Sequence, residues 1–295
     1  MTLEQLRIFV AVAEREHLTQ GARALNLTQS AVSSAIAALE ARYATKLFDR
    51  IGRRIALTDA GRLFLAEARA VLARAAAAEA VLTDLAGLSR GALSLMASQT
   101  VANYWLPPLI QRYRAVHPGI TVSLGIDNTE TVTAAIHDGA ADLGFIEGAI
   151  DDPTLAVTAV AEDELVIVVP AGHSWAGQPP ASEALRQGPW VLREPGSGTR
   201  AMFEAALPGL GLAPDDLTVA LELPSNEAIC SAVAAGAGAT AISRLVAANA
   251  IAAGRLATVA IALPKRHFFV LRHKERYLSK AAKAFFDLAQ APPAV

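Results

Sequence analysis

Short polar side chains that could bind a small anion recur at the points where predicted strands end and helices begin. The candidate residues are Ser98, Gln99, Thr100, Asn128, Thr129, Glu147, Ser197, Gly198 through its backbone N–H, Thr199 and Ser225. In open α/β sheets ligands bind at this edge, and the free N–H groups and the dipole of a helix start favour negative charge. The sequence therefore predicts a binding site for a small anionic effector.

Each polar cluster also has a purely structural interpretation. Ser, Thr and Asn are common N-caps, because their side chains accept a hydrogen bond from a free N–H group of the first helical turn. Glu147 has three interpretations, since a carboxylate repels a dianion: it accepts a hydrogen bond from a protonated ligand, it holds Arg200, or it contributes to packing only. The recurrence of several such helix starts favours the binding site.

The remaining reactive side chains do not form a catalytic or metal-binding pattern. The glycine-containing stretch 193–200 lacks the Walker spacing and its lysine. The six histidines show no paired i, i+4 or Cys–His spacing, and no serine has a histidine and a carboxylate at recognisable spacing. Cys230 lies in an apolar helical stretch, which suits a buried thiol. We therefore expect no cofactor, no metal and no enzyme activity.

A second set of short polar side chains lies near the start of a predicted helix that runs from Thr28 to about Arg42. A short helix over 18–25 precedes it, so the pattern is helix, tight turn, helix. One face of the later helix is apolar, and the opposite face holds Thr28, Gln29, Ser30, Ser33 and Ser34. Such side chains at a helix start can contact phosphates and base edges in the major groove of double-stranded DNA. An ordinary serine-rich exposed face is the alternative.

A basic hairpin is predicted directly after these helices. Residues 47–58 are predicted to form two short strands with Gly52 at the tip, and the arginines beside it are Arg50, Arg53 and Arg54. Arginine on a thin hairpin can enter a minor groove. The distribution of charge also favours DNA binding by the N-terminal part, because residues 1–65 carry a net charge of +3 and residues 91–295 a net charge of −5. A helix-turn-helix with a basic wing predicts a DNA-binding head.

The head resembles that of the LysR-type transcriptional regulators. The similarity lies in LEQLRIFVAVAE at the N-terminus, LTQSAVSSAIAALE through the third helix, LFDR with GRR in the hairpin, and LTDAG at 57–61. The resemblance implies an all-α winged helix-turn-helix domain over residues 1–58, in which Gln29, Ser30 and Ser33 contact bases or phosphates. It also implies that Arg50, Arg53 and Arg54 are the contacts of the wing.

Residues 59–90 are predicted to form a long linker helix and its end. An apolar seam with alternating spacings of four and three residues comprises Phe64, Ala68, Val71, Ala75, Ala78, Leu82 and Leu85. This spacing is typical of a coiled coil, and such a helix extends about 42 Å, beyond a small head. We expect a homodimer through this helix on an interrupted palindrome, because paired heads match paired half-sites; packing against the body of the same chain is the alternative. The resemblance implies homotetramers, and RNA polymerase is a further candidate partner.

The body, residues 91–295, alternates strand-like and helix-like patterns, which predicts α/β layers with mainly parallel sheets. The predicted strands are 92–97, 121–126, 142–146, 165–169, 190–193, 219–223, 239–242 and 268–272. The predicted helices are 101–116, 129–137, 199–207, 226–235 and 277–291. From this pattern the body is one large domain or two small ones. The resemblance to the family's effector domain implies two periplasmic-binding-protein-like lobes, with lobe I at 91–162 and 268–295 and lobe II at 163–267.

Parts of the body resemble one branch of the family, which includes regulators of sulfite reduction and of carbon dioxide fixation. The stretches that carry this similarity are 98–107, 146–148 and 193–200. The resemblance implies that the effector is an inorganic oxyanion such as sulfite, or a phosphorylated or carboxylated metabolite.

Composition narrows the class of protein further. With 53% hydrophobic residues and a net charge of −2 over 295 residues, the chain can bury a large core, which excludes intrinsic disorder. The uncharged and mostly apolar stretch 228–243 contains two glycines and is too short to span a membrane. The N-terminal residues predict an amphipathic helix rather than a signal peptide, and a single cysteine fits a reducing compartment. We therefore expect a cytoplasmic transcription regulator; a solute-binding protein and an α/β enzyme without DNA binding are the alternatives.

Overall fold

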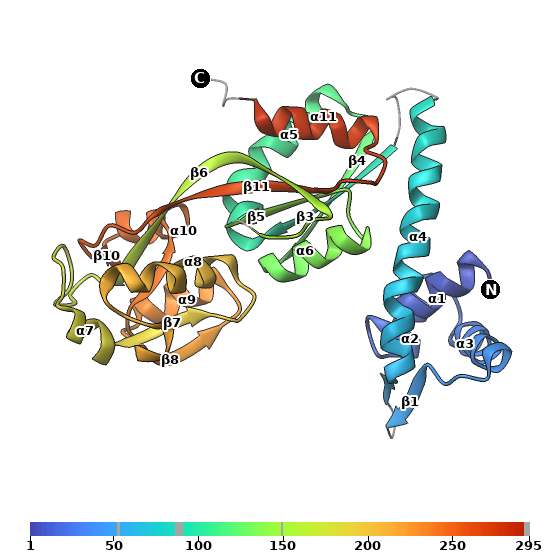
Figure 1. The fold of residues 1–295 in the computed structure, drawn as a ribbon, viewed down its shortest axis with the longest axis horizontal. Coiled ribbons are helices and arrows are strands. Elements are labelled where there is room, and N and C mark those ends of the chain that lie inside the picture. The colour runs from blue at the N-terminus through green and yellow to red at the C-terminus, as the bar shows by residue number, and fades with distance from the viewer. Residues whose placement is uncertain (52–53, 86–90, 149, 292–295) are drawn as a thin grey trace. The chain divides into compact units, whose positions relative to one another are not determined.

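The computed structural model describes residues 1–51, 54–85, 91–148 and 150–291 (Figure 1). The chain divides into two units, one of Met1–Leu85 with Asp138–Ala140 and one that holds the other residues. Each unit has its own apolar core. Over the described ranges, no helix combines the length and the apolar composition that a membrane span requires.

Three short helices form the first part of the smaller unit: α1 (Leu3–Ala13), α2 (Leu18–Ala24) and α3 (Gln29–Tyr43). Thr2 begins α1 with a capping box, because its hydroxyl accepts a hydrogen bond from the backbone N–H of Gln5 while the Gln5 side chain accepts one from Thr2. The Thr28 hydroxyl begins α3 and accepts from the backbone N–H of Ala31 at 3.2 Å. Their shared core includes Leu6, Phe9, Val12, Val32 and Leu39. The predicted helix-turn-helix is confirmed.

A hairpin of two antiparallel strands, β1 (Phe48–Ile51) and β2 (Arg54–Leu57), follows and leads into helix α4 (Asp59–Leu85). Glu40 of α3 holds the start of the hairpin, because its Oε1 accepts from the backbone N–H of Leu47 at 2.8 Å and of Phe48 at 3.2 Å. Gly61 lets α4 approach the same segment, since a Cβ at this position would lie 2.2 Å from the carbonyl oxygen of Leu47. The base of the hairpin is therefore fixed against both helices.

Helix α4 begins inside the core of the head and continues beyond it. The ring of Phe64 lies 4.8 Å from that of Phe9, centroid to centroid, and Ala68 is only 1% exposed. The head therefore covers the first two members of the seam, because these turns of α4 complete its core. The large apolar side chains that α4 leaves exposed are Leu63, Val71, Val81 and Leu82.

The larger unit is built on a seven-stranded sheet of order β10-β6-β11-β5-β3-β4, in which β9 also pairs with β6, and on a separate pair, β7-β8. The strands are β3 (Gly91–Ser98), β4 (Ile120–Asp127), β5 (Leu143–Glu147), β6 (Leu155–Pro170), β7 (Pro189–Arg193), β8 (Thr218–Leu223), β9 (Thr240–Ser243), β10 (Leu256–Thr258) and β11 (Lys265–His273). The helices are α5 (Leu106–Val116), α6 (Thr129–Asp138), α7 (Ser182–Gln187), α8 (Gly198–Ala206), α9 (Asn226–Ala234), α10 (Arg244–Ala252) and α11 (Lys280–Gln290).

The helix predicted over 101–116 is divided in the structure. Val101–Trp105 is π-helical, and α5 begins at Leu106 with prolines in its first turn. Proline has no backbone N–H, so Pro107 and Pro108 cannot donate hydrogen bonds into the preceding turn, and the regular α-helical pattern begins anew there. The π-helical segment directs Tyr104 and Asn103 toward α9, where both side chains contact Glu227.

Two long strands connect the lobes of the larger unit. Figure 1 shows β6 and β11 as neighbouring ribbons that run from the part with α7–α10 to the part with α5, α6 and α11. They pair antiparallel from Lys265 opposite Glu164 to His273 opposite Leu155. The prediction of mainly parallel sheets is wrong: β3 is parallel to β4 and β5, but β6 and β11 pair antiparallel with every neighbour, because each passes between the lobes in the opposite direction.

Separate apolar clusters fill the two lobes. The cluster of lobe I includes Leu93, Leu95, Phe145, Phe268 and Phe285. The main cluster of lobe II includes Trp190, Leu192, Phe203, Leu207 and Leu217. Each lobe therefore has an apolar core of its own.

Candidate functional site

The start of α3 presents the polar side chains that were predicted to contact DNA. Thr28, Gln29, Ser30 and Ser34 are exposed, and Ser33 is half-buried. The Thr19 hydroxyl of α2 donates to Oε1 of Gln29 at 3.0 Å, and the hydroxyls of Thr28 and Ser30 lie 3.1 Å apart. Thr19 thus fixes the orientation of the Gln29 amide, a role that no pattern in the sequence indicates. Exposed donors and acceptors at a helix start are suited to base edges and phosphates.

The wing is described in part. Arg50 is exposed at the end of β1, and the backbone of Arg54 pairs with Ile51 in the hairpin. Arg53 and the side chain of Arg54 lie outside the described residues, so their predicted role as wing contacts stays a prediction.

Glu147 is the centre of a polar network between the two lobes. It ends β5, is 1% exposed, and its Oε1 accepts from the hydroxyl of Thr100 at 3.4 Å and from that of Thr199 at 3.1 Å. Thr100 belongs to lobe I and Thr199 to the first turn of α8 in lobe II. The interpretation that Glu147 holds Arg200 is wrong, because Arg200 donates instead to Glu204 at 2.7 Å and to Glu222 at 2.6 Å.

Arg266 and Asp163 extend this network from the connecting strands. Arg266 is fully buried; its Nε donates to Oδ2 of Asp163 at 2.7 Å and its Nη1 to the Thr199 hydroxyl at 3.0 Å. Asp163 also accepts from the Ser243 hydroxyl at 2.8 Å. Sequence reasoning missed this ion pair because it depends on strand register. The available signal was the acidic run 162–164, which lies opposite the basic run 265–267.

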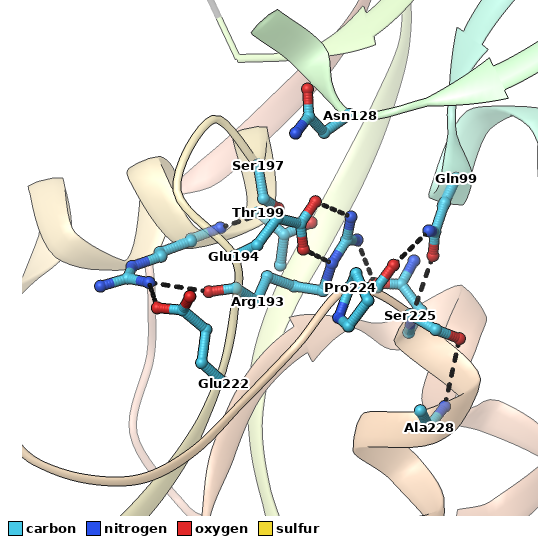
Figure 2. A network of polar contacts seen from close by, with 12 residues as sticks. Gln99, Asn128, Arg193, Glu194, Ser197, Thr199, Glu222, Pro224, Ser225 and Ala228 are labelled. Carbon is cyan, nitrogen blue, oxygen red and sulfur yellow. Dashed lines mark hydrogen bonds and ion pairs between the residues drawn. The ribbon is translucent and has the colours of Figure 1, made fainter. Parts of the chain in front are cut away.

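A chain of amide and guanidinium contacts forms the other side of the network (Figure 2). Gln99 spans the lobes, since its Nε2 donates to the Pro224 carbonyl at 2.6 Å and its Oε1 accepts from the backbone N–H of Asn226 at 3.0 Å. The buried Asn226 side chain donates to the Thr100 hydroxyl at 3.1 Å and accepts from Arg193 at 2.7 Å. Burial raises the pKa of Glu194, but the hydrogen bonds and charge of Arg193 outweigh it and hold the pKa below its usual value.

Some predicted residues act as helix caps in this structure. Ser225 accepts from the backbone N–H of Ala228 at 3.3 Å, Ser197 from that of Arg200 at 3.5 Å, and Asn128 from that of Thr131 at 3.0 Å. Figure 2 shows Asn128 on the side of the network that also holds Ser197 and Glu194. The structural interpretation of these residues therefore holds alongside their proximity to the site.

The helix starts of α6 and α8 meet closely, and glycine makes this approach sterically possible. A Cβ on Gly198 would lie 2.5 Å both from the Thr129 hydroxyl and from the carbonyl oxygen of Glu147. The backbone N–H of Glu130 donates to the carbonyl of Gly196 at 3.1 Å across the same junction. Replacement of Gly198 by any other residue would separate the lobes or displace Glu147.

Buried polar atoms of this network remain without a hydrogen-bond partner among the described residues. They are Thr129 Oγ1, Glu147 Oε2 and Arg266 Nη2, and Ser98 Oγ at the end of β3 is likewise without a partner. Unpaired buried polar atoms are rare in folded proteins and indicate a site for a ligand or water. Asp163 balances the charge of Arg266, and Glu194 that of Arg193, whereas no cation of the described chain lies within salt-bridge distance of Glu147. The network can therefore both donate to and accept from a small polar molecule.

We also searched the described residues for side chains that could bind a metal ion. Within residues 1–51, 54–85, 91–148 and 150–291, no cluster of three or more His, Cys, Asp or Glu side chains is placed to hold a metal ion. The chemistry that the network offers is hydrogen bonding and charge balance.

Comparisons with known proteins agree with this arrangement. Residues 3–62 match the family model "Bacterial regulatory helix-turn-helix protein, lysR family", and residues 86–292 match "LysR substrate binding domain". The chain is 37% identical to the HTH-type transcriptional regulator YeiE of Escherichia coli strain K12, over 97% of this chain and 96% of that one. It is 32% identical to the RuBisCO operon transcriptional regulator of Allochromatium vinosum, over 99% and 97%.

A solved structure resembles the body alone. The regulatory domain of CcmR from Synechocystis PCC6803, solved in complex with 2-PG, is 28% identical, covers 68% of this chain and 96% of that one, and superposes with a TM-score of 0.62. Both family models and both relatives thus agree with the head and the two-lobed body described above. This chain belongs to the LysR family of helix-turn-helix transcriptional regulators, with a DNA-binding head and an effector-binding domain.

Proposed function

We propose that the chain controls transcription by binding an interrupted palindrome through paired heads, and that a small protonated oxyanion such as hydrogen sulfite governs this binding from the network between the lobes. The observation that carries the proposal is the set of buried, unpaired atoms around Glu147 and Arg266. They lie where both lobes and both connecting strands meet, so a ligand there affects the packing of one lobe on the other.

The charge balance of the network favours a ligand that carries a proton. Glu147 Oε2 requires a hydrogen-bond donor, whereas Arg266 Nη2 requires an acceptor, and the hydroxyls of Ser98 and Thr129 can serve either need. A protonated oxyanion offers one O–H donor and several acceptor oxygens. A fully ionised dianion lacks the donor and meets the uncompensated carboxylate of Glu147, which repels it. The regulatory domain of CcmR was solved in complex with 2-PG, which supports a small molecule as the effector.

The exposed apolar stripe of α4 supports a homodimer. Leu63, Val71, Val81 and Leu82 are exposed on one helix, and burial against the α4 of a second chain would remove this surface from water. Two heads held in this way would match two half-sites of DNA. The proposed role as a transcription regulator has further parts. Two dimers join into a tetramer, the protein contacts RNA polymerase, and it acts in the cytoplasm.

The effector can act only through a difference in its affinity for two arrangements of the lobes. In the proposed arrangement the ligand joins Glu147 of lobe I to Arg266 on the connecting strand and Thr199 of lobe II. It thus stabilises the closed lobes and biases the dimer toward one geometry of its heads.

A thermal-shift screen of the full chain tests the effector, with sulfite, sulfate, phosphate and small carboxylates as probes. We expect sulfite to raise the melting temperature and to change the affinity for DNA from upstream of the chain's own gene in a gel-shift assay. The double variant Thr100→Ala and Thr199→Ala should lose both responses, while Thr218→Ala, an exposed hydroxyl of lobe II, should keep them. A response that survives the double variant would place the ligand elsewhere.

A further inference from the structure

A cavity lies in lobe II between α9 and α10, apart from the network around Glu147. Its volume is about 190 Å³, and it is lined by α9 and α10, by Tyr104 of the π-helical segment and by Arg255. A cavity of about 150 Å³ accommodates a benzene molecule in another protein. The space therefore suits a molecule of several heavy atoms rather than a single water or a small ion.

Two opposite charges face this cavity without contacting each other. Glu227 lies in the first turn of α9, Arg255 follows α10, and no salt bridge joins Arg255 to any carboxylate of the described chain. Both charges lie close to the thiol of Cys230 on the cavity wall. Burial chiefly raises the pKa of Cys230 to about 11; the negative charge of Glu227 raises it further, and the positive charge of Arg255 opposes this. The thiol therefore stays neutral and lines the cavity without adding a charge.

Both charged groups retain capacity for a ligand. Glu227 Oε1 accepts only long hydrogen bonds, at 3.4 Å from Asn103 and at 3.3 Å from the Tyr104 hydroxyl, and Oε2 accepts from Ser225 at 3.2 Å. A carboxylate offers about four acceptor positions, and a guanidinium five donors in a planar fork. Arg255 lies on the exposed rim. The rest of the lining includes the apolar Ala234, Val246 and Ala250 and the polar Ser231 and Asn249.

We propose that this cavity binds a small zwitterion, namely an α-amino acid with an aliphatic side chain. Its ammonium group would donate to Glu227, its carboxylate would accept from Arg255, and its side chain would cover Val246 and Ala250. An ion of a single charge would satisfy one of the two groups and would meet repulsion from the other. The two opposite charges therefore specify the two charged ends of the ligand, and Ala234, Val246 and Ala250 offer apolar contacts to its side chain.

The location connects this second site to the movement of the lobes. Asn103 and Tyr104 belong to lobe I, whereas Glu227 belongs to lobe II, so an occupant that draws on Glu227 alters a contact between lobes. The residues that line the cavity are distinct from Thr100, Glu147, Thr199 and Arg266 of the first network. The two sites can therefore be separated by mutation.

Isothermal titration calorimetry of the full chain with L-leucine, L-valine and L-methionine tests the proposal. We expect at least one of them to bind, and its analogues that lack one charge, isocaproate and isoamylamine in the case of leucine, to bind roughly tenfold more weakly or not at all. Glu227→Gln and Arg255→Gln should each weaken binding by roughly tenfold or more. The double variant Thr100→Ala and Thr199→Ala should bind as the parent does, and so should Arg112→Gln, an exposed arginine of lobe I.

Three results would overturn the inference. The first is that none of the three amino acids binds at ~1 mM. The second is that a singly charged analogue binds as tightly as the amino acid, which would contradict the zwitterion. The third is loss of binding in the Thr100 and Thr199 double variant but not in Arg255→Gln, which would assign the amino acid to the first network. The melting temperature of each variant verifies that it folds.

Discussion

Arg266 on β11 and Asp163 on β6 form a fully buried ion pair, with 2.7 Å between Nε and Oδ2, on the two strands that join the lobes. The two residues are register partners in the antiparallel pair. The guanidinium also donates to Thr199 of lobe II, so the pair joins the connecting strands β6 and β11 to the proposed effector site. Its geometry therefore contributes both to the stability of the body and to the position of an effector-binding group.

Removal of one partner of this pair should destabilise the body strongly. Asp163→Ala leaves the arginine buried without its counter-ion, and such losses cost about 3–5 kcal/mol. Urea denaturation monitored by the fluorescence of the lobe II tryptophans measures the free energy of unfolding. The matched control is Lys265→Gln, which removes an exposed pair with Glu162 on the same two strands and should cost less than about 1 kcal/mol. Equal losses in the two variants would contradict the role of the buried pair.

Glu147→Gln should change which anion the network prefers. An amide keeps an oxygen that accepts from Thr100 and Thr199, but its nitrogen donates where Oε2 accepts. The variant should therefore bind sulfite more weakly and sulfate more tightly, and the ratio of the two dissociation constants should change by roughly tenfold. Calorimetric titration of both anions measures this ratio. Glu183→Gln, an exposed carboxyl of α7, serves as the control, and an unchanged ratio in Glu147→Gln would refute the proposed hydrogen bond from the ligand.

The head should lose stability in acid through Glu40. Burial raises the pKa of this carboxyl, but the hydrogen bonds from Leu47, Lys46 and Phe48 outweigh it and lower the pKa below the usual 4.5. A carboxyl whose folded-state pKa is lowered contributes stability that is present above its unfolded pKa and is lost as the pH falls through the folded value. Glu40→Gln should therefore lower the free energy of unfolding of the head at neutral pH and make it less dependent on pH below 4.5.

Far-UV circular dichroism of urea unfolding at neutral pH and at about pH 4 gives this comparison. Glu67→Gln, an exposed carboxyl on α4, provides a control that should keep the pH dependence of the parent. If Glu40→Gln also kept it, the carboxyl would not hold the hairpin as described.

Charged residues on the exposed stripe of α4 should dissociate the dimer. Val71→Lys together with Leu82→Lys places two cations where the proposed partner helix packs, and the two like charges on each chain would face those of the other. Sedimentation velocity should show a species of half the parent's mass. Ala76→Lys, exposed on the opposite face of α4, should leave the mass unchanged. A double variant that keeps the parent's mass would show that another surface forms the dimer.

The sequence predicted those parts of the molecule that depend on local chemistry. The cap at Thr28, the apolar face with Val32 and Leu39, and the hairpin after Leu47 all arise from residues close together in the chain. Most strands of the body were also predicted near their observed positions, because β-branched and apolar runs between turns are local patterns. The strand β10 and the helices α7 and α10 were not predicted, because they are short or follow directly on a strand.

The contents of the site between the lobes depend on contacts distant in the chain. Thr100, Glu147 and Thr199 were predicted and do meet, since each lies at or beyond the end of a strand. Arg266 and Asp163 were missed, because each lies among charged neighbours and is therefore predicted to be exposed to solvent. Only the register of β6 and β11 brings the two together. For the same reason the first part of β6, with its acidic run 162–164, was not predicted as a strand. At the start of α9 the sequence pattern predicted Ser225, the N-cap, as an effector-binding residue. Its neighbour Asn226 makes the buried contacts with Arg193 and Thr100 instead.

The most direct test of the account is the preference of the head for operator over scrambled duplex, measured by fluorescence anisotropy at one salt concentration. The triple variant Gln29→Ala, Ser30→Ala and Ser33→Ala should lose about 1–3 kcal/mol of this preference, because base contacts determine specificity. Arg50→Ala is the matched control and should weaken binding to both duplexes alike, since a phosphate contact carries no sequence information. A triple variant that discriminates between the two duplexes as well as the parent does would contradict the assignment of α3 as the helix that reads DNA.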